Sequence, residues 1–291
     1  LVSKSFFEIL SNSLTNPKYE EHLSLSDEDQ VKILNPLSGE LSVMRQSLIF
    51  SGLEAVAYNI NRKRSNLRLF EFGKTYKQEG EGHQESSHLS VLLSGDRHED
   101  SWILENRESD FYFLRAVVEA VIGRLGISGL SSEPLESTLV SEGLAIYRGK
   151  TLLASIGVVD SSVLQIFDIK QEVLYADLEW DQLVKLAGRT SIVFDDIPKY
   201  PEVKRDFALL IDDNVTFRQI HDIAVRSERK LLKNVSLFDV YTGKNLPEGK
   251  KSYAVSFTLQ DKQKTLTDKQ IDKIMNKLQK QYESELGAEL R

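Results

Sequence analysis

The stretch Lys233–Asp261, KNVSLFDVYTGKNLPEGKKSYAVSFTLQD, decides the fold of the last third of this 291-residue chain. From Tyr253 to Leu259, apolar side chains alternate with small polar ones, which is the period-2 pattern of a strand with one buried face. A second run rich in apolar residues, Val235–Tyr241, comes before it, and a basic turn with Gly and Pro separates the two. The stretch therefore predicts two neighbouring strands, Val235–Tyr241 and Ser252–Leu259.

A helix signature lies on each side of these strands. Thr216 with Gln219, and Thr267 with Gln270, each fit a capping box, in which the Thr and Gln side chains satisfy free backbone N–H groups. Apolar residues at helical spacing follow both boxes and predict these inward positions: Phe217, Ile220, Ala224 and Leu231, then Ile271, Ile274, Met275, Leu278 and Tyr282. With a strand at Lys204–Ile211 and a short last strand at Gly287–Arg291, the order is βαββαβ, which predicts a ferredoxin-like fold.

The earlier part of the chain mixes short strands with a few helices. Ser51 and Glu54 fit a further capping box at the start of a predicted helix, Ser51–Arg62. The other expected helices are Phe111–Leu125 and Asp181–Ala187, and Gln78–Ser87 is expected to be a loop. Strands are expected near Phe6–Leu14, near Gln30–Leu34, and at Leu67–Tyr76, Leu89–Leu93, Leu144–Tyr147, Thr151–Val159 and Val173–Trp180. Several of these strands are neighbours through tight turns, which favours an antiparallel sheet and an α+β fold class.

Two prolines and an acidic pair between residues 188 and 201 mark a boundary, which predicts domains 1–195 and 196–291. Charge divides in a similar way. Residues 197–291 carry 18 Lys and Arg against 14 Asp and Glu, a net charge of +4. Because the whole chain has a net charge of −7, the residues before 197 carry −11. The basic second part suggests an anionic partner, although a solvated lysine-rich surface explains the same numbers.

Sequence motifs for catalysis are missing. The chain has no cysteine, its five histidines form no zinc-binding pattern, and it contains neither GxSxG nor GxGxxG. We therefore expect no catalytic residue, no metal and no cofactor in this chain. Because no apolar run is long enough to span a bilayer, we expect no membrane and a cytoplasmic location.

The remaining possibility is binding. An exposed sheet can stack bases on aromatic rings while a basic rim neutralises phosphate. The expected rim residues are Arg226, Arg229, Lys230, Lys233, Lys250 and Lys251, the first four of them from the first helix of the module. Asp239 and Tyr241 lie two residues apart, so their side chains point to the same side of the strand. By residue 239 this side must face away from the core, because an unpaired buried carboxylate is costly. Two interpretations are open from these residues alone. The favoured one is that Tyr241 packs on the following turn and Asp239 caps that turn; the other is that the two side chains contact a base.

The chain resembles the bacterial phenylalanyl-tRNA synthetase beta-subunit family over nearly its whole length. In the last third the matching stretches are IPKYPEVKRDFALLIDD, FDVYTGKNLPEGKKSYAVSFTLQD, KTLTDKQID and GAELR, and they resemble its C-terminal ferredoxin-fold anticodon-binding domain. Earlier matches are NPLSGELSVMRQSLIFSGLEAVAYNINR, LRLFEFGKTY, DFYFLRAVVEAVIGRLGI and GVVDSSVLQIFDIKQEVLYADLEW. The resemblance implies that the chain is a C-terminal fragment of such a subunit.

For the first domain, the resemblance implies a catalytically silent sheet of the class II aminoacyl-tRNA synthetase type. The family's catalytic relatives hold ATP with an Arg-x-Glu strand motif, whereas Arg68 and Glu71 lie three apart here. In the family, the alpha subunit joins phenylalanine to tRNA(Phe) with ATP and magnesium, in an (αβ)2 assembly that the beta subunit scaffolds.

For the second domain, the resemblance assigns anticodon binding to Asp239 and Tyr241. The carboxylate would hydrogen-bond the first anticodon base and the ring would stack on it, which reverses the preference reached from the residues alone. One rival hypothesis is a small-molecule regulatory module on the same βαββαβ plan, attached to a protein-interaction domain. A free RNA-binding protein is a second rival, disfavoured because the aromatic ribonucleoprotein motif is missing.

Overall fold

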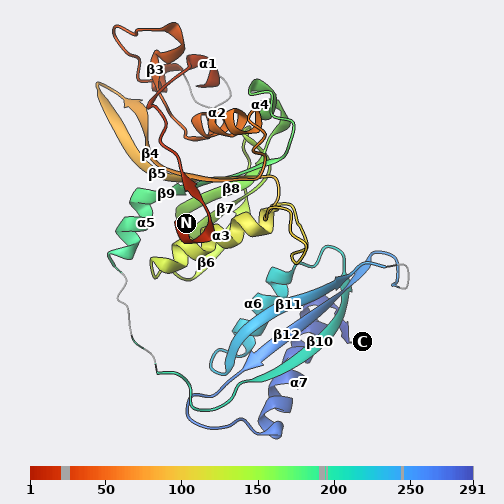
Figure 1. Ribbon diagram of the computed structural model, residues 1–291. Coiled ribbons are helices and arrows are strands. Elements are labelled where there is room, and N and C mark those ends of the chain that lie inside the picture. Colours follow the sequence, from red (N-terminus) through yellow and green to blue (C-terminus); the bar gives the residue numbers. More distant parts are fainter. Residues whose placement is uncertain (21–26, 190–193, 195, 244–245, 291) are drawn as a thin grey trace. The chain divides into compact units, whose positions relative to one another are not determined.

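The structure is a computed structural model that describes residues 1–20, 27–189, 194, 196–243 and 246–290 (Figure 1). The chain divides into two compact units, Leu1–Val193 and Phe194–Arg291, beside the boundary expected between residues 195 and 196. Each unit has a hydrophobic core of its own. None of the helices in the described ranges is long and apolar enough to cross a membrane.

The first unit is built on a seven-stranded sheet with the strand order β1-β4-β5-β9-β8-β7-β6. All neighbouring strands are antiparallel except β1 and β4, which run parallel. The strands are β1 (Phe7–Glu8), β4 (Leu67–Glu79), β5 (Gly82–Ser94), β6 (Leu130–Pro134), β7 (Val140–Arg148), β8 (Thr151–Val159) and β9 (Val173–Glu179), with a separate pair β2 (Leu14–Thr15) and β3 (Val43–Met44). The sequence-based expectation of an α+β fold with an antiparallel sheet is confirmed.

Helices cover both faces of this sheet (Figure 1). Buried residues of α2 (Ile49–Ile60) and α4 (Ser161–Ile166) form one core with one face. Those of α3 (Phe111–Arg124) and α5 (Trp180–Ala187) form a second core with the other face. The Asp110 carboxylate starts α3 by accepting a hydrogen bond from the backbone N–H of Phe113 at 2.8 Å. A short helix α1 (Pro17–Glu20) and 3-10 turns at Val2–Lys4, Asp27–Asp29 and Gly39–Leu41 complete the unit.

The prediction of a capping box at Ser51 and Glu54 is wrong. The helix α2 begins two residues earlier, and the Ser51 hydroxyl donates to the carbonyl of Leu48 at 3.2 Å. Leu48, Ile49 and Phe50 are all at most 1% exposed. Burial of this apolar run, rather than a side-chain cap, therefore sets where the helix starts.

Three further expectations for the first unit are wrong. The segment Gln78–Ser87 is not a loop, because β4 and β5 stay paired out to Glu79 and Gly82. The strand expected near Phe6–Leu14 is reduced to the two residues of β1, with Leu14 beginning β2. The segment Gln30–Leu34 contains only an isolated bridge, from Lys32 to Val43.

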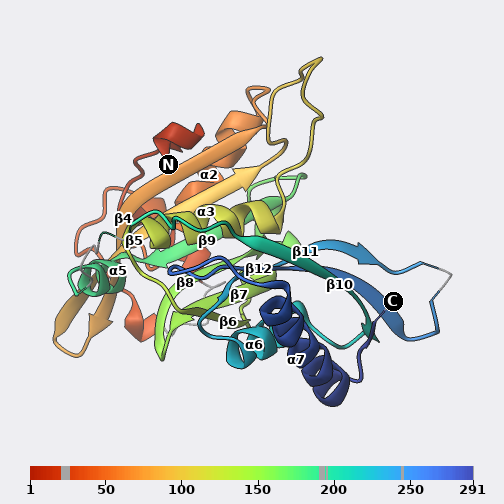
Figure 2. The ribbon, with the colours of Figure 1, turned by 90° about the horizontal axis from the view of Figure 1, so that it is seen from below.

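The second unit is a four-stranded antiparallel sheet in the order β11-β12-β10-β13, with both helices on one face (Figure 2). Its elements are β10 (Val203–Asp212), α6 (Phe217–Ser227), β11 (Leu232–Tyr241), β12 (Lys250–Leu259), α7 (Asp268–Leu286) and β13 (Glu289–Leu290). The predicted βαββαβ order is confirmed. This arrangement leaves the outer face of the sheet without a helix.

Both capping boxes predicted for the second unit are present, at Thr216 with Gln219 and at Thr267 with Gln270. Leu231, expected inside the first helix, lies beyond its end, although it still packs against the core. Gly287 ends α7 with a φ of 59°, a left-handed conformation that suits glycine. The last residue of the expected final strand, Arg291, lies outside the described residues.

Candidate nucleic-acid interface

A β-bulge in β11 decides which way Asp239 faces. Leu237 pairs with Val255, but Asp239 pairs with Ala254, so one extra residue is inserted between two consecutive partners on β12. Paired residues point to the same side of a sheet. Because Val255 faces the helices and its neighbour Ala254 faces the other way, the bulge turns Asp239 to the outer face of the sheet.

Tyr241 lies on the same outer face, because it pairs with Ser252, two residues from Ala254. Continuing across the sheet, Ala254 pairs with Ala208 of β10. The row of Asp239 therefore continues across the sheet through two small side chains, whereas the row of Tyr241 continues through Ser252 to Leu210. The two alanines leave room for a planar group beside Asp239.

The Tyr241 ring rests on the turn that follows its strand. A Cβ atom added to Gly243 would lie 2.1 Å from the ring, so only a glycine permits this approach. The Tyr241 side chain is nevertheless exposed, with the residue at 42%. The packing of Tyr241 on the following turn, one of the two expectations from the sequence, is thus present together with an accessible ring.

Asp239 is exposed, and no described residue donates a hydrogen bond to its carboxylate. The capping of the turn by Asp239 therefore finds no support among residues 196–243 and 246–290. A carboxylate in this state can accept hydrogen bonds from a ligand, such as the amino group of a base.

The six expected rim cations divide into two groups. The first group is already bound within the unit: Arg226 pairs with Glu285 at 2.6 Å, and Lys250 lies 3.7 Å from Asp212 and 3.6 Å from Glu289. Lys251 belongs to it too, because its ammonium donates to the carbonyl of Asp213 at 2.7 Å and lies over the Tyr253 ring.

The second group, Arg229, Lys230 and Lys233, is exposed. The expectation that these residues belong to the first helix is wrong, because α6 ends at Ser227. Arg229 and Lys230 lie in the connection to β11, and Lys233 lies on β11 itself. These residues lie at the start of β11, and Tyr241 lies at its other end, about 26 Å from Lys233 at 3.3 Å per residue.

Sequence reasoning missed a further set of cations on α7. It used the apolar positions of this helix but not the lysines at its solvent side, which are Lys269, Lys273, Lys277 and Lys280. Their spacing of four, four and three residues is itself the signal, because it places them on one helix face.

In the first unit, Arg68 and Glu71 lie on opposite faces of the sheet, since they are three apart on one strand. Arg68 extends over the Phe113 ring of α3. Glu71 is fully buried on the other side, where it pairs with Arg45 at 3.0 Å and accepts hydrogen bonds from the Ser11 hydroxyl. The two side chains cannot bind one nucleotide together. Within the described part of the chain, no three His, Asp or Glu residues come together to hold a metal ion.

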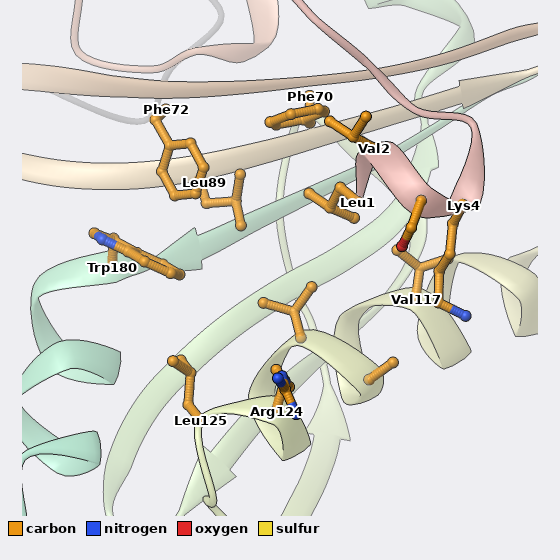
Figure 3. A pocket seen from close by; sticks show the side chains of 13 residues that line it. Leu1, Val2, Lys4, Phe70, Phe72, Leu89, Val117, Arg124, Leu125 and Trp180 are labelled. Carbon is orange, nitrogen blue, oxygen red and sulfur yellow. The ribbon is translucent and has the colours of Figure 1, made fainter.

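An apolar pocket of about 510 Å³ lies beside α3 in the first unit. Figure 3 shows the rings of Phe70, Phe72 and Trp180 around this space, with Leu89 beside the Phe72 ring and Val117 nearer to Lys4. The Phe72 and Trp180 rings meet edge to face at a centroid distance of 4.8 Å. This lining is mostly apolar and suits an apolar side chain, and its charged members are Lys4 and Arg124.

Comparison with known proteins matches both units to families. Residues 1–180 match the profile of the phenylalanyl tRNA synthetase beta chain CLM domain, and residues 198–291 match that of the ferredoxin-fold anticodon binding domain. A crystal structure of pyrrolysyl-tRNA synthetase from Desulfitobacterium hafniense shares the fold at a TM-score of 0.50 and 14% identity, over 65% of this chain and 66% of that one. The chain thus combines a synthetase-like sheet with a ferredoxin-fold anticodon-binding domain.

The chain belongs to the family of phenylalanyl-tRNA synthetase beta chains. It is 45% identical to the phenylalanine--tRNA ligase beta subunit of Bacteroides fragilis, 43% to that of Porphyromonas gingivalis and 36% to that of Syntrophotalea carbinolica. Each match covers 100% of this chain but only 37% of the relative. The chain therefore spans little more than a third of the length of these relatives.

Proposed function

We propose that this chain binds the anticodon loop of tRNA(Phe) through Asp239 and Tyr241. The observation that carries the proposal is the bulge in β11, which turns both side chains to the helix-free face of the sheet. The family match of residues 198–291 to an anticodon-binding domain supports the same surface.

The two side chains have complementary tasks in this proposal. The Tyr241 ring has one side against Gly243 and is otherwise accessible, so a base can stack on it without the ring having to be ordered first. The Asp239 carboxylate, on the same face, accepts a hydrogen bond from the edge of that base. Stacking supplies most of the affinity, and the hydrogen bond supplies the preference for one base over another.

The first unit acts as a scaffold in this proposal. Its Arg68 and Glu71 side chains are engaged on opposite faces of the sheet, so ATP and magnesium are held by a partner alpha subunit. In an (αβ)2 assembly that partner joins phenylalanine to tRNA(Phe), while this chain positions the tRNA. The assembly works in the cytoplasm, where its tRNA substrate is found.

Binding of an anticodon stem-loop of tRNA(Phe) to the 291-residue chain tests the proposal. Tyr241→Ala is expected to weaken binding by about 1–3 kcal/mol through loss of one stacked base, and Tyr241→Phe to retain it. Tyr112→Ala, which removes a ring that is 78% exposed in the first unit, is the matched control and should bind normally.

A stem-loop with a changed first anticodon base separates the role of Asp239 from that of Tyr241. The wild-type chain should discriminate against this stem-loop, and Asp239→Asn should reduce the discrimination more than the overall affinity. Equal affinity of the wild-type chain for an unrelated hairpin, or wild-type binding by Tyr241→Ala, refutes the proposed site.

A further inference from the structure

Four lysines form a basic face on α7, and we call Lys269, Lys273, Lys277 and Lys280 the α7 lysine face. All four are exposed, whereas the other side of α7 is buried in the core through residues such as Ile271 and Leu278. At 3.6 residues per turn they lie within a sector of roughly 80° and extend about 17 Å along the helix axis. The face is therefore a narrow, straight row of ammonium groups.

Three of the four ammonium groups of this face have no direct ion pair with a described carboxylate. Among the residues described, no carboxylate lies within 4 Å of the ammonium groups of Lys269, Lys273 or Lys280. Two exposed carboxylates lie beside the face: Asp272, which lines the same surface groove as the four lysines, and Glu283, which accepts a hydrogen bond from Gln279. Glu285 is held by Arg226. Like charges four apart on a helix repel one another and destabilise it, a cost that a bound anion would remove.

The α7 lysine face continues onto the neighbouring connection. The Lys277 ammonium donates to the carbonyl of Ser227, the last residue of α6, at 2.5 Å. Arg229 and Lys230 follow two and three residues later, and both are exposed. Lys233, also exposed, is the second residue of the edge strand β11, which ends at Tyr241. A basic track therefore runs from α7 to the strand that carries the proposed anticodon site.

The chemistry of the face favours nucleic acid as its occupant. Interfaces between proteins are depleted in lysine and need a buried apolar centre, which the exposed side of α7 between Lys269 and Lys280 does not offer. Lysines bind phosphates as point charges without reading sequence, and several in a row match a repeating polyanion.

We propose that the α7 lysine face, together with Arg229 and Lys230, binds the phosphodiester backbone of tRNA outside the anticodon. This inference rests on the proposed function and extends it. Tyr241 and Asp239 hold a base at one end of β11, and the basic track holds phosphates beyond the other end. Of the six rim cations expected from the sequence, Arg229 and Lys230 remain part of this surface, whereas Arg226 and Lys250 are paired with carboxylates of the unit.

The test compares two triple variants of the 291-residue chain. Lys269→Gln/Lys273→Gln/Lys280→Gln removes three charges from the face but keeps Lys277, which contacts α6. Gln and Lys have similar helix propensities, so α7 should remain folded, as thermal unfolding would verify. The control Lys150→Gln/Lys170→Gln/Lys185→Gln removes three exposed lysines of the first unit.

Binding of full-length tRNA(Phe) transcript is measured at several salt concentrations. Each phosphate contact contributes about 0.7–0.9 to the magnitude of the slope of log K against log salt. Loss of three contacts in the α7 variant should therefore make the slope shallower by about 2–3. The control variant should leave it unchanged. Tyr241→Ala should weaken binding without changing the slope, because stacking releases no counterion.

The outcomes separate this inference from the proposed function. A wild-type chain that does not bind tRNA refutes the proposed function. Normal wild-type binding with the same slope in the α7 variant overturns the α7 inference alone. Tight binding of polyglutamate to the wild-type chain, lost in the α7 variant while tRNA binding is kept, assigns the face to an acidic protein and likewise overturns it.

Discussion

Breaking the buried ion pair between Arg45 and Glu71 is predicted to destabilise the first unit strongly. Arg45 is 4% exposed and Glu71 is 0% exposed. Besides Glu71, the Arg45 guanidinium donates to the carbonyl of Lys74 at 2.9 Å and to the Ser11 hydroxyl at 2.6 Å. Arg45→Met leaves the Glu71 carboxylate buried without a counter-charge, so the free energy of unfolding should fall by about 3–5 kcal/mol.

Two further variants test the reasoning behind this magnitude. Replacing both partners, as Arg45→Met/Glu71→Met, removes the uncompensated charge and should recover more than half of the loss. Gly73→Ala should cost about 1–3 kcal/mol, because an added Cβ lies 2.5 Å from the Arg45 guanidinium and 2.7 Å from Leu48. Lys74→Met, which removes an ion pair that is half exposed on both sides, is the control and should change little.

Urea unfolding followed by tryptophan fluorescence measures these changes. The only two tryptophans of the sequence, Trp102 and Trp180, belong to the first unit, so the signal reports on that unit alone. A loss below about 1 kcal/mol in Arg45→Met, or a double variant less stable than the single one, would refute the electrostatic argument.

Two other predictions follow from particular contacts. Burial by itself would lower the pKa of His88, but the hydrogen bond to Asp177 and the nearby carboxylates outweigh it and raise that pKa above 6.5. The first unit should thus keep this stabilisation below pH 6.5 and lose it as pH rises through the raised pKa. Urea unfolding across pH should show this loss, and His88→Gln should abolish it. Deleting Phe238 keeps Asp239 opposite Ala254 and should preserve stem-loop binding, whereas deleting Val240 moves Tyr241 to the core side and should abolish it.

Local signals were sufficient for most of the second unit. The capping boxes at Thr216 and Thr267 and the alternation in β12 each act within a few residues, so the sequence determines them without knowledge of the rest of the chain. The same pattern misled at Ser51, where the apolar residues before it are buried by tertiary contacts and extend the helix. In this chain the capping-box pattern failed at the one site where a buried apolar run, Leu48–Phe50, directly precedes it.

Polar strands escaped prediction for a different reason. The outer part of the β4–β5 hairpin, near Glu79 and Gly82, extends beyond the residues of β5 that pair with β9, so it is a two-stranded arm. Neither side of such an arm faces a core, so its sequence lacks the apolar alternation by which strands are recognised. It is specified by pairing between its two strands, which a pattern of single residues does not contain.

The proposed anticodon site depends partly on a local sequence pattern and partly on pairing between two strands. Because Asp239 and Tyr241 are two apart, the sequence correctly places them on one side of their strand. Regular alternation from Val235 and Leu237 would nevertheless point both toward the core, and the cost of burying a carboxylate shows only that the alternation must break. The register shift between Leu237 and Asp239 is the break, and it depends on pairing with β12. The accessibility of the proposed base-reading pair is therefore a property of two strands together, which explains why the residues alone favoured packing on the turn.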